Sequence, residues 1–186
     1  MGRPKYEQGD ITAKRKIENA FWEMLSEMPF DKITARSLSK RAEVNHNTFY
    51  RYFSSIEQLA HEVFEESLIR EIPAMLIQSD SANIYSPKIP KDSYRKALLY
   101  ARSGSQLLIG ILRNAIEKTW LETIGVSKES LTLNQVIDLD IIFGGITFLM
   151  GDTSIAPDTD TIANITSRAL GKEMVATLQA MHESFE

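Results

Sequence analysis

The 186-residue chain contains no cysteine. Disulfide bonds, thiol catalysis and metal sites with cysteine ligands are therefore excluded. Its three histidines, His46, His61 and His182, do not have the spacing of metal ligands, and no phosphate-binding loop, dinucleotide fingerprint or nucleophile elbow is present. We therefore expect neither catalysis nor a bound cofactor or metal.

Signals for secretion or membrane insertion are also missing. The first residues, M-G-R-P-K-Y-E, provide no apolar core for a signal peptide. The longest mostly apolar run covers residues 141–151, well short of the roughly 20 residues that a membrane-spanning helix needs. We expect a cytoplasmic protein.

Basic residues are too few for a generally cationic surface, because the net charge is −4. Their distribution is uneven. Residues 1–56 hold 10 Lys+Arg against 7 Asp+Glu, a net charge of +3, whereas residues 57–186 hold 11 against 18, a net charge of −7. A mildly basic N-terminal part on an acidic remainder suits nucleic-acid contact by the N-terminal part alone.

Residues 34–53 are the stretch around which the chain is organised, and they predict two short helices joined by a tight turn. Thr34 is the expected N-cap of the first helix, which ends near Ala42. Asn45 is the expected N-cap of the second, over residues 46–52.

The second of these helices has an apolar face and a polar face. Phe49 and Phe53 should point inward, while the outward residues are hydrogen-bonding groups without negative charge: His46, Asn47, Thr48, Tyr50 and Arg51. Such groups meet phosphates and base edges, and the pair of helices outlines a DNA-binding helix-turn-helix. An ordinary helical hairpin has the same pattern, so that alternative stays open. Residues 45–55 contain no acid that would repel a phosphate backbone, which favours DNA binding.

Helical periodicity on both sides of this unit predicts an all-α fold. A helix over residues 10–28 stops at Pro29 and carries an apolar stripe of Ile17, Ala20, Phe21, Met24, Leu25 and Met28. Ser55 and Gln58 have the spacing of a capping box for a helix that runs to about residue 78 and is kinked at Pro73. After a loop over residues 79–91, helices are expected from residue 92 to a break at Gly104, then over residues 107–124, 133–150 and 159–185.

The helix over residues 133–150 is apolar on almost every side, and Gly144 and Gly145 lie in its middle at a cost of about 1 kcal/mol each relative to alanine. Such a helix is buried on more than one face. We predict that it and the last helix pair with a second copy as a four-helix bundle; the alternative is burial within one chain. The expected interface residues are Val136, Ile137, Gly144, Gly145, Phe148, Ile165, Leu178 and Met181.

Residues 10–64, about a third of the chain, resemble the TetR (tetracycline-repressor-like) family of bacterial regulators. The resemblance rests on P-F-D-K-I-T at 29–34, L-S-K-R-A-E-V-N at 38–45, T-F-Y-R-Y-F at 48–53 and E-Q-L at 57–59. It implies a homodimer whose two heads place their third helices in successive major grooves of double-stranded DNA, on a palindromic operator. Residues 1–54 would be the DNA-binding helix-turn-helix domain, and residues 55–186 the helical regulatory and dimerisation domain.

The resemblance also assigns roles by position. Residues matching Asn45, His46 and Asn47 lie nearest the bases, and the other matching polar residues meet or support the backbone. With the basic residues of the N-terminal part, the expected DNA contacts are Arg3, Lys14, Thr34, Arg36, Asn45, His46, Asn47, Thr48, Tyr50, Arg51 and Tyr52. Glu43 stands where the family usually has glycine, and Ile56 where it often has a phosphate-binding lysine. Both departures predict weaker DNA binding, or more dependence on the basic N-terminal arm.

By the same resemblance, the body binds a small-molecule effector that releases a repressor from DNA. The residues expected to line its pocket are Met75, Tyr100, Leu108, Leu112, Trp120, Phe143 and Phe148. Apolar residues at helical spacing are also ordinary core residues. Two alternatives stay open for the body: binding of a protein partner, and a helical enzyme.

Overall fold

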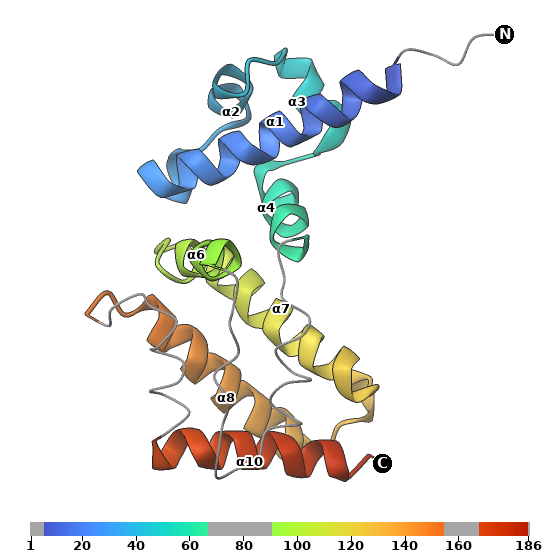
Figure 1. The fold of residues 1–186 in the computed structure, drawn as a ribbon, viewed down its shortest axis with the longest axis vertical. Coiled ribbons are helices and arrows are strands. Elements are labelled where there is room, and N and C mark those ends of the chain that lie inside the picture. Colours follow the sequence, from blue (N-terminus) through green and yellow to red (C-terminus); the bar gives the residue numbers. More distant parts are fainter. Residues whose placement is uncertain (1–5, 67–90, 155–167, 186) are drawn as a thin grey trace, which may run out of the picture.

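The computed structural model describes residues 6–66, 91–154 and 168–185, and these residues form helices and connecting turns without a strand. Figure 1 shows an elongated molecule, with a small group of helices at one end and a larger group at the other. The predicted all-α fold, a helix-turn-helix head followed by a helical body, is confirmed. The boundary predicted at residues 54 and 55 coincides with the N-cap of α4 and stays a prediction.

The head consists of α1 (Tyr6–Glu27), the 3-10 turn η1 (Phe30–Lys32), α2 (Ala35–Arg41) and α3 (His46–Tyr52). The first helix begins four residues earlier than expected and ends before Pro29 as expected. Its predicted apolar stripe is confirmed, since every member is buried except the half-buried Met28. Trp22, which lies beside that stripe, is also buried because its ring packs 5.5 Å from the ring of Tyr100 in the body.

Side-chain caps begin the short helices as expected. Thr34 accepts a hydrogen bond from the N–H of Ser37 and its own N–H donates to the Ser37 hydroxyl, which makes a full capping box. Asn45 caps α3 through its side-chain oxygen. At the start of α4 the expected box is only half formed. The Ser55 hydroxyl accepts from the backbone N–H of Gln58. The side-chain carbonyl of Gln58, however, accepts from the N–H of Ser54 and not from that of Ser55.

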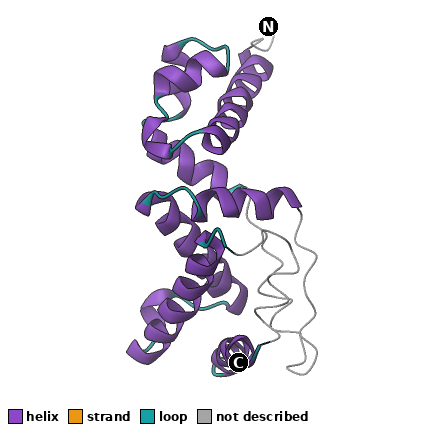
Figure 2. Ribbon diagram, turned by 90° about the vertical axis from the view of Figure 1, so that its left-hand side faces the viewer, coloured by secondary structure: helices purple, strands orange, loops and turns teal. Residues whose placement is uncertain are grey.

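The body begins with α4 (Ile56–Glu65), which runs from the head toward α7 (Figures 1 and 2). The remaining elements are α6 (Lys91–Ala101), α7 (Gln106–Ile124), η2 (Lys128–Ser130), α8 (Leu133–Gly151) and α10 (Ala169–Glu183). The expected breaks at Gly104 and Gly125 are confirmed, and both glycines have a positive φ of 68–69° that other residues rarely adopt. The kink at Pro73, most of the loop over residues 79–91 and the start of the last predicted helix lie outside the described residues.

The described residues form two clusters of buried side chains. The first is continuous from the head into the body, because α1, α2, α3 and α4 share it with α6 and the first half of α7. Tyr100 lies at its centre: its hydroxyl donates to the carbonyl of Ala60 at 2.7 Å and its ring lies 4.4 Å from that of Phe64. The second cluster joins the end of α7 to α8 and α10. The head is therefore packed onto the body and is not tethered by a flexible linker.

Helix α8 differs from the expectation that no segment could span a membrane. Within the described part of the chain it is the helix that is long and apolar enough to do so by length and composition. The uninterrupted run of residues 141–151 is short, but the helix also includes eight residues before it, where only Asp138 and Asp140 are charged. Helix α8 carries these two carboxylates and packs on α6, α7 and α10 in the body.

Glu43, in the turn between α2 and α3, has a φ of 54°, in the left-handed region where a side chain is strained. Glu43→Gly should therefore raise the free energy of unfolding by about 0.5–1 kcal/mol and the melting temperature by roughly 1–4 °C. Thermal unfolding monitored by circular dichroism measures this. Glu43→Ala is the matched control: it removes the carboxylate but keeps the Cβ, so it should not stabilise. Equal stabilisation by both variants would show that charge, not backbone strain, is responsible.

Candidate nucleic-acid interface

Helix α3 is held in the head by two aromatic anchors. Phe49 and Phe53 are fully buried, and their rings pack 5.7 Å apart in the first cluster. Because these residues occupy one side of α3, the opposite side faces solvent. It is made of two neighbouring columns at i and i+4 spacing, His46 with Tyr50 and Asn47 with Arg51. The predicted division of α3 into inward and outward residues is confirmed.

The aromatic groups on the outer side of α3 are held in place by other rings. Tyr50 is 54% exposed, yet its ring meets those of His46 and Phe49 edge to face, with centroids 5.1 and 5.2 Å away. The guanidinium of Arg51 lies 5.9 Å from the centroid of the half-buried Tyr52 ring. A preorganised surface of this kind loses little side-chain entropy when it binds a ligand.

The charges near this surface favour a polyanion. Arg51 is the basic residue of α3, and Arg36 and Lys40 are exposed on α2. Arg41 has a different role: its guanidinium donates to both carboxylate oxygens of Glu27 at 3.0 and 2.7 Å, which ties α2 to α1. The hydrogen bond from Arg41 lowers the pKa of the Glu27 carboxyl below its usual value.

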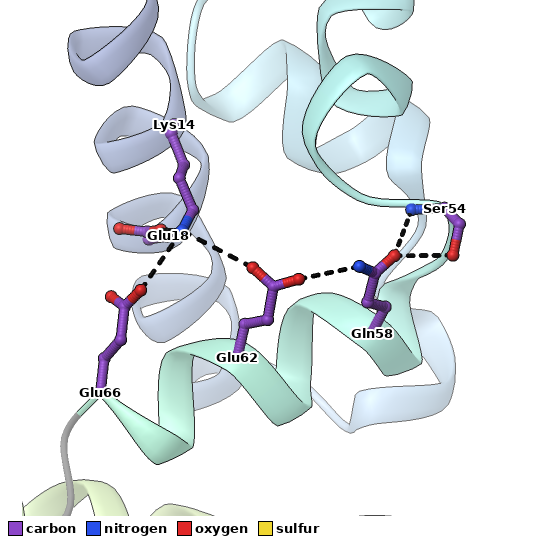
Figure 3. Close-up of polar contacts among 6 residues, drawn as sticks. All are labelled: Lys14, Glu18, Ser54, Gln58, Glu62 and Glu66. Carbon is purple, nitrogen blue, oxygen red and sulfur yellow. Dashed lines mark hydrogen bonds and ion pairs between the residues drawn. The ribbon is translucent and has the colours of Figure 1, made fainter.

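Lys14, an expected DNA contact, forms ion pairs within the chain. Figure 3 shows its ammonium among three carboxylates, with Glu18 in α1 and Glu62 and Glu66 on or beside α4, at 3.2–3.6 Å. Burial lowers the pKa of Lys14, but the hydrogen bond to Glu66 and the charge of Glu18 outweigh it, so the pKa lies above its ordinary value. This geometry supports a role for Lys14 in joining α1 to α4, because the three carboxylates neutralise the ammonium charge that would otherwise attract a phosphate.

The same network reaches the end of α3. Glu62 accepts from the side-chain amide of Gln58 at 2.8 Å, and Gln58 accepts from both the N–H and the hydroxyl of Ser54 (Figure 3). Glu18 belongs to the same network through Lys14. Burial raises the pKa of its carboxyl, and the nearby negative charge of Glu66 raises it further. Sequence reasoning missed Ser54 and Gln58 as a linked pair; the signal was the serine directly before the expected capping box.

The predicted DNA contacts therefore fall into groups. His46, Asn47, Tyr50 and Arg51 lie together on the outer side of α3, with Thr48 and Tyr52 half-buried at its edges. Thr34 and Asn45 are exposed, but their side-chain oxygens accept the capping bonds of α2 and α3. Arg36 is exposed one residue into α2, and Arg3 lies outside the described residues.

The residues predicted to line one effector pocket do not surround one space. Tyr100, Leu108 and Leu112 are buried in the first cluster, whereas Trp120 and Phe143 belong to the second. Phe148 is 75% exposed on α8 and lines neither, and Met75 lies outside the described residues. The physical reason is that α7 passes through both clusters. Leu108 and Leu112, near its start, therefore belong to one core, and Trp120, farther along, belongs to the other. A hollow of about 230 Å³ lies elsewhere, between α1 and α2, and is lined mainly by polar residues.

The predicted interface residues are divided as well. Leu178 and Met181 are buried against α8 in the second cluster, so the single chain already covers them and their assignment to a dimer interface is corrected. Ile137 and Phe148 are exposed, and Val136, Gly144 and Gly145 are half-exposed, while Ile165 lies outside the described residues. Among the described residues outside its own helix turn, an added Cβ at Gly144 or Gly145 would meet no atom within 4 Å, so neither glycine serves a close contact there.

Comparison with known proteins gives a family for the head. Residues 19–63 match the family model described as bacterial regulatory proteins, tetR family. Neither a curated protein nor a solved structure matches the chain. The matched residues run from the middle of α1 into α4 and include the whole helix-turn-helix. The N-terminal domain of the chain is therefore a DNA-binding domain of the TetR family of transcription regulators.

Proposed function

We propose that the protein is a homodimeric repressor that binds a palindromic operator through α3 and leaves it when its body binds a small-molecule effector. The observation that carries the DNA-binding part is the outer side of α3. It presents hydrogen-bonding and cationic groups without an acid, on a helix anchored by Phe49 and Phe53. A helix-turn-helix places such a side in the major groove, where base edges are distinguishable.

The dimer is supported by an apolar stripe along α8, defined by Leu133, Ile137, Ile141 and Phe148. These residues recur at helical spacing and are 74, 45, 66 and 75% exposed in the single chain. Exposed apolar side chains in contiguous rows mark protein interfaces, and Gly144 on the same row lets a second backbone approach closely. We propose a second copy as the occupant, because two heads are needed to read a palindrome.

The effector part is supported by the shared core of head and body. Tyr100 links α6 to α4 by the hydrogen bond to Ala60, and Lys118 on α7 pairs with Glu65 of α4 at 3.0 Å. A molecule that moved α6 or α7 would therefore move α4 and, through the network of Figure 3, the end of α3. The alternative is a protein partner that acts on the same helices. A helical enzyme is disfavoured, because the matched family consists of regulatory proteins.

Arg51→Ala should weaken binding to an operator isolated from a random DNA pool by about tenfold and lower the salt dependence of binding by about two ions, one for each protomer of the dimer. The expected loss reflects one phosphate contact removed from each protomer. Gel-shift titration at several salt concentrations measures both quantities. Arg95→Ala is the matched control, because it removes an exposed arginine of the body, and unchanged binding by Arg51→Ala would contradict the docking of α3 proposed above.

Lys14→Met should leave the salt dependence of operator binding unchanged, because the ammonium is already paired with Glu18, Glu62 and Glu66. It should instead lower the melting temperature, since three carboxylates lose their shared counter-ion. The two measurements are the salt series above and thermal unfolding. A salt dependence reduced as much as in Arg51→Ala would restore Lys14 as a phosphate contact.

Ile141→Glu should convert the dimer to a monomer, because it places a charge in the middle of the apolar stripe. Light scattering coupled to size exclusion, over a range of protein concentrations, measures the mass. Asn134→Glu is the matched control: it adds the same charge at an exposed position of α8 beside the stripe. A wild-type protein that stays monomeric at all concentrations, or a dimer that Ile141→Glu leaves intact, would remove this helix from the interface.

A further inference from the structure

We infer that Asn47 reads an adenine in each operator half-site, whereas Asn45 sets the start of α3 and reads no base. The inference rests on the proposed DNA-binding function and deepens it by naming the base and the residue that selects it. The two asparagines are two positions apart in the sequence, and the family resemblance implies that both lie near the bases. The structure distinguishes between them.

The side chain of Asn45 is already used within the protein. Its Oδ1 accepts the backbone N–H of Asn47 at 2.9 Å, which caps α3. Recognition of adenine by an asparagine requires the amide oxygen and the amide nitrogen to lie together in the plane of the base, facing its N6 and N7. The capping bond turns the oxygen of Asn45 back toward the helix, so that arrangement would break the cap.

The side chain of Asn47 has the opposite surroundings. It is exposed at the second position of α3, and no hydrogen bond to its side-chain amide is formed within the described part of the chain. Residues at the N-terminal end of the second helix are those that a helix-turn-helix presents to base edges. A side-chain amide offers a donor and an acceptor side by side, a combination that matches adenine in the major groove.

The neighbours of Asn47 on the outer side of α3 are an aromatic pair and a cation. His46 packs edge to face on Tyr50, and these two form the adjacent column of the helix surface. Arg51, one turn after Asn47 on the same column, supplies the positive charge that a nearby phosphate attracts. Asn47 therefore lies beside an aromatic column and one turn before a cation, on the exposed side of α3.

The test is selection of bound sequences from a random duplex DNA pool by the full-length wild type and three variants, Asn47→Ala, Asn45→Ser and Asn45→Ala. The wild type should enrich a palindromic site with an adenine strongly preferred at one position of each half. Asn47→Ala should lose that preference, by about 5- to 150-fold in relative affinity, and keep the preferences at other positions. Asn45→Ser keeps a capping hydroxyl and should select the wild-type site. Asn45→Ala should bind all sites more weakly without a changed preference.

Circular dichroism shows that each variant is folded before its selection is compared. The inference is overturned if Asn47→Ala selects the same adenine as the wild type, or if Asn45→Ser loses a preferred base. A wild-type site without a conserved adenine overturns it too. Failure of the proposed function gives a different result, because the wild type itself would then enrich no sequence.

Discussion

The burial of Phe49 and Phe53 is the interaction on which the head depends. A helix of seven residues is far too short to be stable in water by itself, since nucleation is costly and few hydrogen bonds repay it. Two fully buried rings attach α3 to α1, α2 and α4, and the caps at Thr34 and Asn45 fix where α2 and α3 begin. The outer side of α3 is consequently rigid, and a rigid surface is what base recognition needs.

The same cluster extends into the body, and the proposed response to an effector depends on this continuity. Tyr100 contacts α1 through Phe21 and Trp22 and α4 through Phe64 and Ala60, so one side chain of α6 touches both a helix of the head and the first helix of the body. Burial keeps the phenol protonated by raising its pKa far above the ordinary value, which preserves its O–H as a donor. A change in the packing of α6 therefore reaches the head through a packed core.

Some charged groups in the head are exposed, whereas others form ion pairs that join helices. Arg41 and Lys14 are basic residues of a basic region, yet both are paired with glutamates and connect helices. Arg36, Lys40 and Arg51 are exposed on α2 and α3, and Arg15, Lys16 and Lys32 are exposed on α1 and η1. In the body, the buried carboxylate of Glu117 is paired in the same way with Lys128 at 2.6 Å and with Arg113. The net charge of residues 1–56 thus indicated which end of the molecule carries the DNA-binding domain. It did not indicate which of the basic residues there are paired within the chain.

The amino-acid sequence by itself determined the all-α class, most helix limits, the caps at Thr34 and Asn45, and the two faces of α3. These features depend on residues three or four apart, whose relation within a helix is set by local geometry. Only the tertiary structure decided that Lys14 pairs with α4, that Trp22 is covered by α6, and that Leu178 and Met181 pack inside the chain while Ile141 does not. Those outcomes depend on which helices become neighbours. The residues next to an apolar or charged side chain in the sequence do not indicate which distant residues will cover it or pair with it.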